Sequence, residues 1–177
     1  ESESSQNKVG LICENLHAER LNVAKDFKMD FTKIFEEFCL DLDGRGESVT
    51  LRPHPGGQYV LKHNVVLPSN VLIDNNPIYR VSLKDFAYGI SAPSSILIDM
   101  MLAEIPVAVW HDESGIMDIS NYEGLTEICT IQDWLDFKNE ATRDPGKFLA
   151  KQKLFLKNSQ LLIDPKEVYD RFSKLLV

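Results

Sequence analysis

The chain has 177 residues, 44% of them hydrophobic, and a formal net charge of -8 at pH 7. This length and apolar content are typical of one globular domain with a sizeable core. The negative charge argues against general binding to nucleic acid or to an anionic membrane surface, because both need a basic field. No apolar run approaches the roughly 20 residues that cross a bilayer.

The first residues and the cysteines give two further expectations. Residues 1–7 are polar and lack the order of a secretory signal. We interpret them as a leader that is disordered or was introduced by cloning, and residues 8–177 as a single domain with a helical C-terminal tail. The three cysteines, Cys13, Cys39 and Cys129, lie far apart without metal-ligand spacing. We interpret them as buried side chains in a reducing, cytoplasmic compartment.

The first half of this domain alternates strand-like and helix-like segments. Lys8 to Glu14 is a short apolar run typical of a buried strand. Asp30 to Leu42 has apolar residues at helical spacing, with Asp30 as the expected helix cap. Ser48 to Arg52 is the next strand, and we expect it to end at Pro53, which cannot donate to a sheet.

The second half continues the alternation and adds a loop that we expect to be exposed, Ser114 to Tyr122. The further expected strands are Val71–Asp74, Ala87–Ser91, Pro106–Trp110 and Glu127–Ile131. The further expected helices are Pro77–Phe86, Pro93–Ala103, a helical stretch from Gln132 with a break near Asp144, and Lys166–Leu176. This alternation predicts an α/β fold, a Rossmann-like three-layer domain with a mainly parallel sheet and helices on both faces.

The segment RPHPGG, Arg52 to Gly57, follows a predicted strand directly. In parallel sheets, ligands bind outside the carboxyl ends of the strands. Two prolines stiffen the backbone on either side of His54, and Gly56 permits a close approach of backbone to ligand. His54 is therefore placed to donate a hydrogen bond to a phosphate or to transfer a proton. The alternative is a histidine that only shapes a turn.

The segment SAPSS, Ser91 to Ser95, joins another strand to a helix. We expect Ala92 to cap this helix, because a residue before proline avoids helical angles, and Ser94 and Ser95 to lie in the first turn. Backbone N–H groups in a first turn lack intrahelical partners and attract anions. Asp99 lies one turn further on, where it would accept hydrogen bonds from a ribose or base. The alternative is an ordinary helix start whose acidic residue is favoured by the helix dipole.

Other polar residues carry weaker signals. His17 and Arg20 follow the first strand and would add positive charge at the same sheet edge, although a solvated loop is the simpler interpretation. His63 and His111 are interpreted as ordinary surface or loop residues. The sequence contains no GxGxxG, Walker, HExxH or GxSxG motif, so the usual dinucleotide, P-loop, zinc-protease and hydrolase interpretations lack their support.

The order of these segments resembles a known family over roughly residues 8–134. A strand ending in LRPHP, followed later by APSSILIDMMLAEIPVAVW, is similar to the C-terminal nucleotide-binding half of GT-B glycosyltransferases. It is most similar to the group of CDP-glycerol glycerophosphotransferases, polysialyltransferases and capsule Kdo transferases. The matching residues are His54, Pro55, Ser94, Ser95, Asp99 and Pro106. Two features depart from the family: the usual Gly-rich first loop is absent, and Ala103-Glu104-Ile105 replaces a glycine-containing turn.

The resemblance implies that His54, as the catalytic residue, and Ser94 and Ser95 contact the phosphate of a nucleotide donor, with Asp99 on the ribose side. We place Gly56 and Arg20 in the same nucleotide-binding site. The donor implied is a CMP- or CDP-linked sugar, used as a substrate, with no cofactor and no metal. The implied partners are a glycan or lipid-linked acceptor and an N-terminal GT-B domain in the full-length protein, but no nucleic acid.

The function expected from this resemblance is donor binding in a sugar or polyol-phosphate transferase that makes a bacterial surface polysaccharide. We expect the isolated domain to be inactive or incomplete, because the acceptor site and commonly the base come from the other domain. We expect a cytoplasmic protein, held at the inner face of the membrane only through the rest of the enzyme. The alternatives are a UDP-N-acetylglucosamine 2-epimerase-like domain and a non-catalytic α/β binding module.

Overall fold

The computed structural model describes residues 9–14, 26–56 and 59–159, together with Lys166 and Ser173. Within these residues, six parallel strands form one sheet in the order β3-β2-β1-β4-β5-β6. The strands are β1 (Gly10–Glu14), β2 (Val49–Pro53), β3 (Val71–Ile73), β4 (Tyr88–Ser91), β5 (Val107–Trp110) and β6 (Thr126–Ile128). The chain builds the sheet outward from β1 to β3 and then crosses back to β4 beside β1. This is the Rossmann arrangement, so the predicted fold is confirmed.

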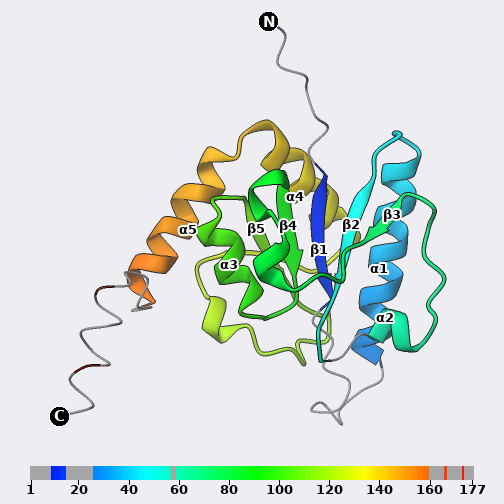
Figure 1. Cartoon of the computed structure of the whole chain (residues 1–177), viewed down its shortest axis with the longest axis horizontal. Helices are drawn as coiled ribbons and strands as arrows, with labels where there is room; N and C mark the ends of the chain where they lie inside the picture. Colours follow the sequence, from blue (N-terminus) through cyan, green and yellow to red (C-terminus); the bar gives the residue numbers. More distant parts are fainter. Residues whose placement is uncertain (1–8, 15–25, 57–58, 160–165, 167–172, 174–177) are drawn as a thin grey trace, which may run out of the picture.

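Helices cover both faces of the sheet. They are α1 (Asp26–Asp43), α2 (Tyr59–Lys62), α3 (Ile96–Leu102), α4 (Ile131–Arg143) and α5 (Gly146–Asn158). One core lies between the sheet and α1, α2 and α4, where Phe31 packs edge-on against Trp110 and Trp134. The other core lies under α3 and receives side chains of α5. Figure 1 shows α1 and α5 at opposite sides of the molecule.

Successive residues of β1 supply the two cores in turn. Ile12 belongs to the core under α1, while Leu11 and Cys13 belong to the core under α3. This alternation follows from the pleat of a strand, which sends neighbouring side chains to opposite faces. Because both faces are covered, the central strands read as continuous apolar runs in the sequence. No helix among the described residues is long and apolar enough to cross a membrane.

The predicted start of the first helix was wrong, and the predicted strand 48–52 is shifted by one residue. Helix α1 begins at Asp26 rather than at Asp30, so Asp30 lies inside the helix and does not cap it. The segment between these residues contains no glycine or proline to stop the helix from extending. Strand β2 includes Pro53, which pairs in register with Glu14. A proline at the last position of a strand is tolerated because it leaves few ladder bonds unmade.

The predicted helix Pro77–Phe86 was also wrong. Two short 3-10 turns stand there, η1 (Ile78–Arg80) and η2 (Leu83–Asp85), with the extended residue Val81 next to η1. Neither turn contains a fully buried residue, and only Leu83 and Phe86 pack against the core under α3, so little burial stabilises a longer helix. The short helix α2 was not predicted; its Val60 is buried in the core under α1.

The C-terminal part of the described chain follows the prediction more closely. Strand β6 ends before the predicted Ile131, because Thr130 caps α4 in a capping box with Asp133. The expected break near Asp144 separates α4 from α5. The predicted loop 114–122 contains one 3-10 turn, η3 (Ser120–Tyr122). The leader 1–7 and most of the last predicted helix lie outside the described residues, although Lys166 and Ser173 are both helical.

Candidate functional site

A cavity of about 180 Å³ opens at the carboxyl ends of β1, β2 and β4. We call it the carboxyl-edge cavity. Its polar lining is Glu14 from β1, Arg52 and His54 from the end of β2, and Ser94, Ser95 and Asp99 from the start of α3. Strand β1 lies between β2 and β4, so the cavity sits where the strand order reverses, the usual ligand position in open parallel sheets. The structure therefore brings His54, Ser94, Ser95 and Asp99 together, as the sequence predicted.

The His54 ring is oriented by its own loop. The backbone amide of Gly56 donates a hydrogen bond to His54 Nδ1 at 3.0 Å. A neutral imidazole that accepts at Nδ1 carries its proton on Nε2, which makes Nε2 a donor. Gly56 itself does not line the cavity, and its amide donates to the His54 ring instead. The predicted stiffness of His54 thus comes from this hydrogen bond as well as from its flanking prolines.

The serine segment differs from the prediction. Helix α3 begins at Ile96, after the predicted start at Pro93, and the residue that precedes it is Ser95, so Ala92 is not the cap. The Ser94 hydroxyl accepts a long hydrogen bond, 3.5 Å, from the amide of Ile96. Partial burial raises the pKa of Tyr122, and the Ser94 backbone opposes this rise. The serine hydroxyl thus bonds an amide of the helix start, a local pattern that competes with extension of the helix toward Pro93.

Arg52 is a cavity residue that the sequence analysis did not include in the site. Its side chain is only 6% exposed, and Nη1 donates to the carbonyl oxygen of Asn76 at 2.7 Å. Partial burial raises the pKa of Asp99, and the positive charge of Arg52 opposes part of this rise. A buried cation is costly unless it is paired. The available signal was a charged residue closing the apolar strand SVTLR.

Glu14 is the second residue that the sequence analysis missed. It closes β1, is 1% exposed, and its Oε2 accepts from the amide of Val60 at 3.2 Å. Burial raises the pKa of Glu14 to about 7, against the opposing effect of backbone hydrogen bonds from Val60 and Tyr59. The signal was again a charge at the end of an apolar run, KVGLICE.

Other candidate residues lie elsewhere. His17 and Arg20 are outside the described residues, so their place in the site stays a prediction. His63 is exposed at the end of α2 and His111 follows β5; neither lines the carboxyl-edge cavity. Cys13 and Cys39 are buried, as expected, and Cys129 is partly buried. Among the described residues, no cluster of three or more His, Cys, Asp or Glu side chains is arranged to hold a metal ion.

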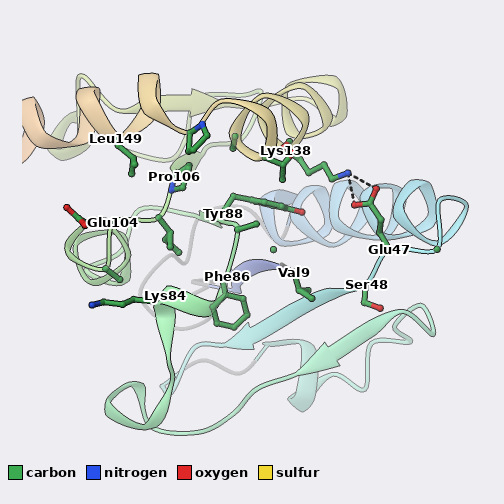
Figure 2. Close-up of a pocket in the computed structure, with 18 residues that line it drawn as sticks. Val9, Glu47, Ser48, Lys84, Phe86, Tyr88, Glu104, Pro106, Lys138 and Leu149 are labelled. Atoms are coloured by element: carbon green, nitrogen blue, oxygen red, sulfur yellow. Dashed lines mark hydrogen bonds and ion pairs between the residues drawn. The ribbon is translucent and has the colours of Figure 1, made fainter. Parts of the chain in front are cut away.

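A wider hollow of about 800 Å³ lies at the opposite, amino edge of the sheet. Figure 2 shows its lining, in which Lys138 reaches Glu47 beside the Tyr88 ring. The Lys138 ammonium contacts both carboxylate oxygens of Glu47, at 2.7 and 2.6 Å. This amino-edge hollow is larger, but its buried lysine is already neutralised and it lies away from the strand ends where parallel sheets bind ligands. The carboxyl-edge cavity is therefore the better candidate site.

No protein-family model and no curated protein sequence matches this chain. Solved structures do match it. CalG4, the calicheamicin glycosyltransferase, aligns with 96% of this chain and 42% of its own, with a TM-score of 0.62 and 10% identity. The spinosyn forosaminyltransferase SpnP aligns with 95% of this chain and 43% of its own, with a TM-score of 0.57 and 15% identity. The glycosyltransferase of kitacinnamycin aligns with 97% and 44%, with a TM-score of 0.56 and 15% identity.

The chain shares its Rossmann-like α/β fold with part of each of these glycosyltransferases. At identities of 10 to 15%, this is a likeness of fold. The chain spans less than half the length of each of these glycosyltransferases. The likeness agrees with the GT-B resemblance inferred from the LRPHP and APSS motifs. It does not distinguish the CDP-glycerol and polysialic acid group from other GT-B proteins.

Proposed function

We propose that this GT-B domain binds the nucleotide donor of a sugar or polyol-phosphate transferase that makes a bacterial surface polysaccharide. One observation carries the proposal. A buried guanidinium, an imidazole and two serine hydroxyls, from segments far apart in the sequence, line one cavity at the carboxyl edge of the sheet. Guanidinium, imidazole N–H and hydroxyl groups are all hydrogen-bond donors to phosphate oxygens, and the charged one binds most strongly.

Each residue has a role in this proposal. Arg52 binds a donor phosphate through its planar fork of N–H groups, and His54 donates from Nε2 to the same group. Ser94 and Ser95 add hydroxyl donors, and Asp99 accepts from the ribose. Gly56 acts through His54, because its amide holds the imidazole in the donating orientation. Arg20 remains part of the proposed site on the sequence argument alone.

For a sugar donor, the acceptor oxygen forms a bond to the anomeric carbon while the bond from that carbon to the phosphate oxygen breaks. For a polyol-phosphate donor, the acceptor oxygen forms a bond to the outer phosphorus while the P–O bond to the nucleotide breaks. In both cases the electron pair stays on the leaving nucleotide, and the proton of the acceptor hydroxyl goes to the base. Negative charge therefore grows on the phosphate, where Arg52 and His54 stabilise it. The proposed step uses no metal or cofactor. Its acceptor and base come from a second GT-B domain, since the matched glycosyltransferases are more than twice as long as the aligned part.

The finer identity of the donor follows from the sequence motifs. The pattern of His54-Pro55 followed by Ser94, Ser95 and Asp99 resembles enzymes that use cytidine nucleotides, so we propose a CMP- or CDP-linked donor and a glycan or lipid-linked acceptor. We also propose that the protein is cytoplasmic and that the rest of the enzyme holds it at the inner face of the membrane. The structures that match in fold are named for calicheamicin, spinosyn and kitacinnamycin, so they support the transferase fold rather than these finer assignments.

Calorimetric titration of the chain with CMP, CDP, UMP and UDP tests the proposal. We expect CDP to bind, and His54→Ala to weaken its binding by about 1 to 3 kcal/mol because a hydrogen bond to a charged group is lost. His111→Ala removes a histidine that follows β5 outside the cavity lining and is expected to leave the affinity unchanged. Absence of binding by all four nucleotides at millimolar concentration would contradict the proposal. A preference for uridine nucleotides would favour the 2-epimerase-like alternative.

A further inference from the structure

Glu14 stands out because it is a buried acid at the centre of the carboxyl edge. It is the last residue of β1 and is 1% exposed. Along the strand it alternates with Cys13, so its side chain lies on the same face as Ile12, under α1 and α2. Arg52 is in register with Cys13 and lies on the other face. Glu14 and Arg52 therefore border the carboxyl-edge cavity from opposite faces of the sheet.

Glu14 anchors both ends of the segment that carries His54. At one end, Pro53 is the register partner of Glu14 in the sheet. At the other end, the Glu14 carboxylate accepts hydrogen bonds from the backbone of Tyr59 and from Val60 N, the latter at 3.2 Å. These are the first residues of α2. A helix of four residues has little stability of its own, so α2 depends on this carboxylate and on the burial of Val60.

Burial of the Glu14 carboxylate costs desolvation free energy. Its Oε1 is buried and makes no hydrogen bond within the described residues. Among the described residues, the charged and titratable groups that border the cavity beside Glu14 are the Cys13 thiol, Arg52, His54 and Asp99, and the Glu14 carboxylate accepts from the two α2 amides. An apolar side chain would avoid the cost of desolvation but would leave those amides unpaired. The contacts thus connect Glu14 with the placement of α2.

We propose that Glu14 is a positioning residue for His54. By fixing the start of α2 against the end of β1, it holds the chain on both sides of His54 and Gly56 and so keeps Gly56 N–H on His54 Nδ1. His54 Nε2 then remains the donor to the nucleotide phosphate. The use of His54 as a donor to phosphate rests on the proposed function. The contacts of Glu14 with α2 and of Gly56 with His54 exist without any ligand.

The ligand-free test is the tautomer of His54, read by long-range proton–nitrogen NMR of the imidazoles. Wild type is expected to show a proton on Nε2 and none on Nδ1, because Gly56 N donates to Nδ1. Glu14→Ala is expected to release Gly56 and give a mixture of tautomers. Glu14→Gln keeps one acceptor oxygen for the α2 amides and is expected to retain the wild-type tautomer. His111, whose Nδ1 lies 3.1 Å from the Asp112 carbonyl, supplies the reference signal of the opposite tautomer.

Asp112→Asn is the matched control. Asp112 is also an acidic residue with 1% exposure, and it follows the end of β5. Its carboxylate accepts from the amides of Ile116 at 3.0 Å and Met117 at 2.8 Å. Loss of its charge should affect that loop and leave His54 unchanged. If Glu14→Ala does not fold, Glu14→Asp replaces it, because the shorter side chain withdraws its carboxylate from α2 and should give the same mixture. A single wild-type tautomer in a folded Ala or Asp variant would overturn the proposal.

The second readout is the affinity for CDP. Glu14→Ala is expected to raise the CDP Kd by roughly tenfold through misplacement of His54, and Glu14→Gln should restore most of the affinity. A changed tautomer with no binding of CDP by wild type would mean that the proposed function fails while the positioning role stands. Binding of CDP by wild type with an unchanged tautomer in the Ala or Asp variant would mean the reverse.

Discussion

Arg52→Met is expected to weaken CDP binding by about 3 kcal/mol, roughly a hundredfold, because one charged partner of the phosphate is removed. Methionine keeps an unbranched apolar stem for the buried position but has no donors. The fold is expected to survive with reduced stability, because the cost of burying the guanidinium disappears while the Asn76 carbonyl loses its donor. Calorimetry gives the affinity, and thermal denaturation of the same samples gives the stability.

Arg80→Met is the matched control for this experiment. Arg80 is an exposed arginine in η1 whose guanidinium lies 5.8 Å from the Tyr79 ring centroid, and it does not line the carboxyl-edge cavity. Its replacement should leave the CDP affinity unchanged, apart from a small screened effect of net charge. An Arg52→Met variant that is folded and binds CDP as wild type does would place the phosphate outside this cavity.

Gly10→Ala is expected to lower the free energy of unfolding by about 3 kcal/mol, because it overfills a tightly packed part of the sheet. Gly10 and Tyr88 are register partners in β1 and β4. A Cβ atom on Gly10 would overlap the phenol ring of Tyr88, which lies across the glycine. Phe137 holds the ring on another side, edge-on with centroids 6.0 Å apart, so the ring clears the methyl group only by giving up this packing and moving toward the amino-edge hollow. Urea denaturation followed by circular dichroism measures the change.

Gly44→Ala provides the control, because the nearest atoms to its added Cβ would be 3.5 Å away and the site is exposed. We expect its effect to stay within about 0.5 kcal/mol. The double variant Gly10→Ala/Tyr88→Val should be less destabilised than the sum of the two single changes, since the smaller side chain makes room for the methyl group. Equal stability of Gly10→Ala and wild type would show that the Tyr88 ring does not occupy this place.

The elements that the sequence predicted well are those whose burial is complete. Strands β1, β4 and β5 are covered on both faces, so they appear in the sequence as apolar runs bounded by polar turns. Boundaries set by particular tertiary or local contacts were missed. The start of α3 lies at the bond from the Ile96 amide to the Ser94 hydroxyl, and the two 3-10 turns near Tyr79 form where no residue is fully buried.

The candidate site was predictable only in part. His54, Ser94 and Asp99 were found because each belongs to a short motif next to a strand end. Arg52 and Glu14 were missed because each looks like a polar residue that simply ends a strand. Their burial becomes visible only when β1 is placed between β2 and β4, and no local pattern encodes that strand order. The missing information was therefore which segments are neighbours in the sheet.

The central claim is that the carboxyl-edge cavity binds the phosphate of a nucleotide, and a titration of the labelled chain with CDP followed by amide NMR tests it most directly. We expect the largest changes in amide chemical shift at residues that line that cavity, namely Arg52, His54, Ser94 and Asp99. Changes confined to the amino-edge hollow, at Ser48, Lys84 and Ala103, or no changes at millimolar CDP, would contradict it.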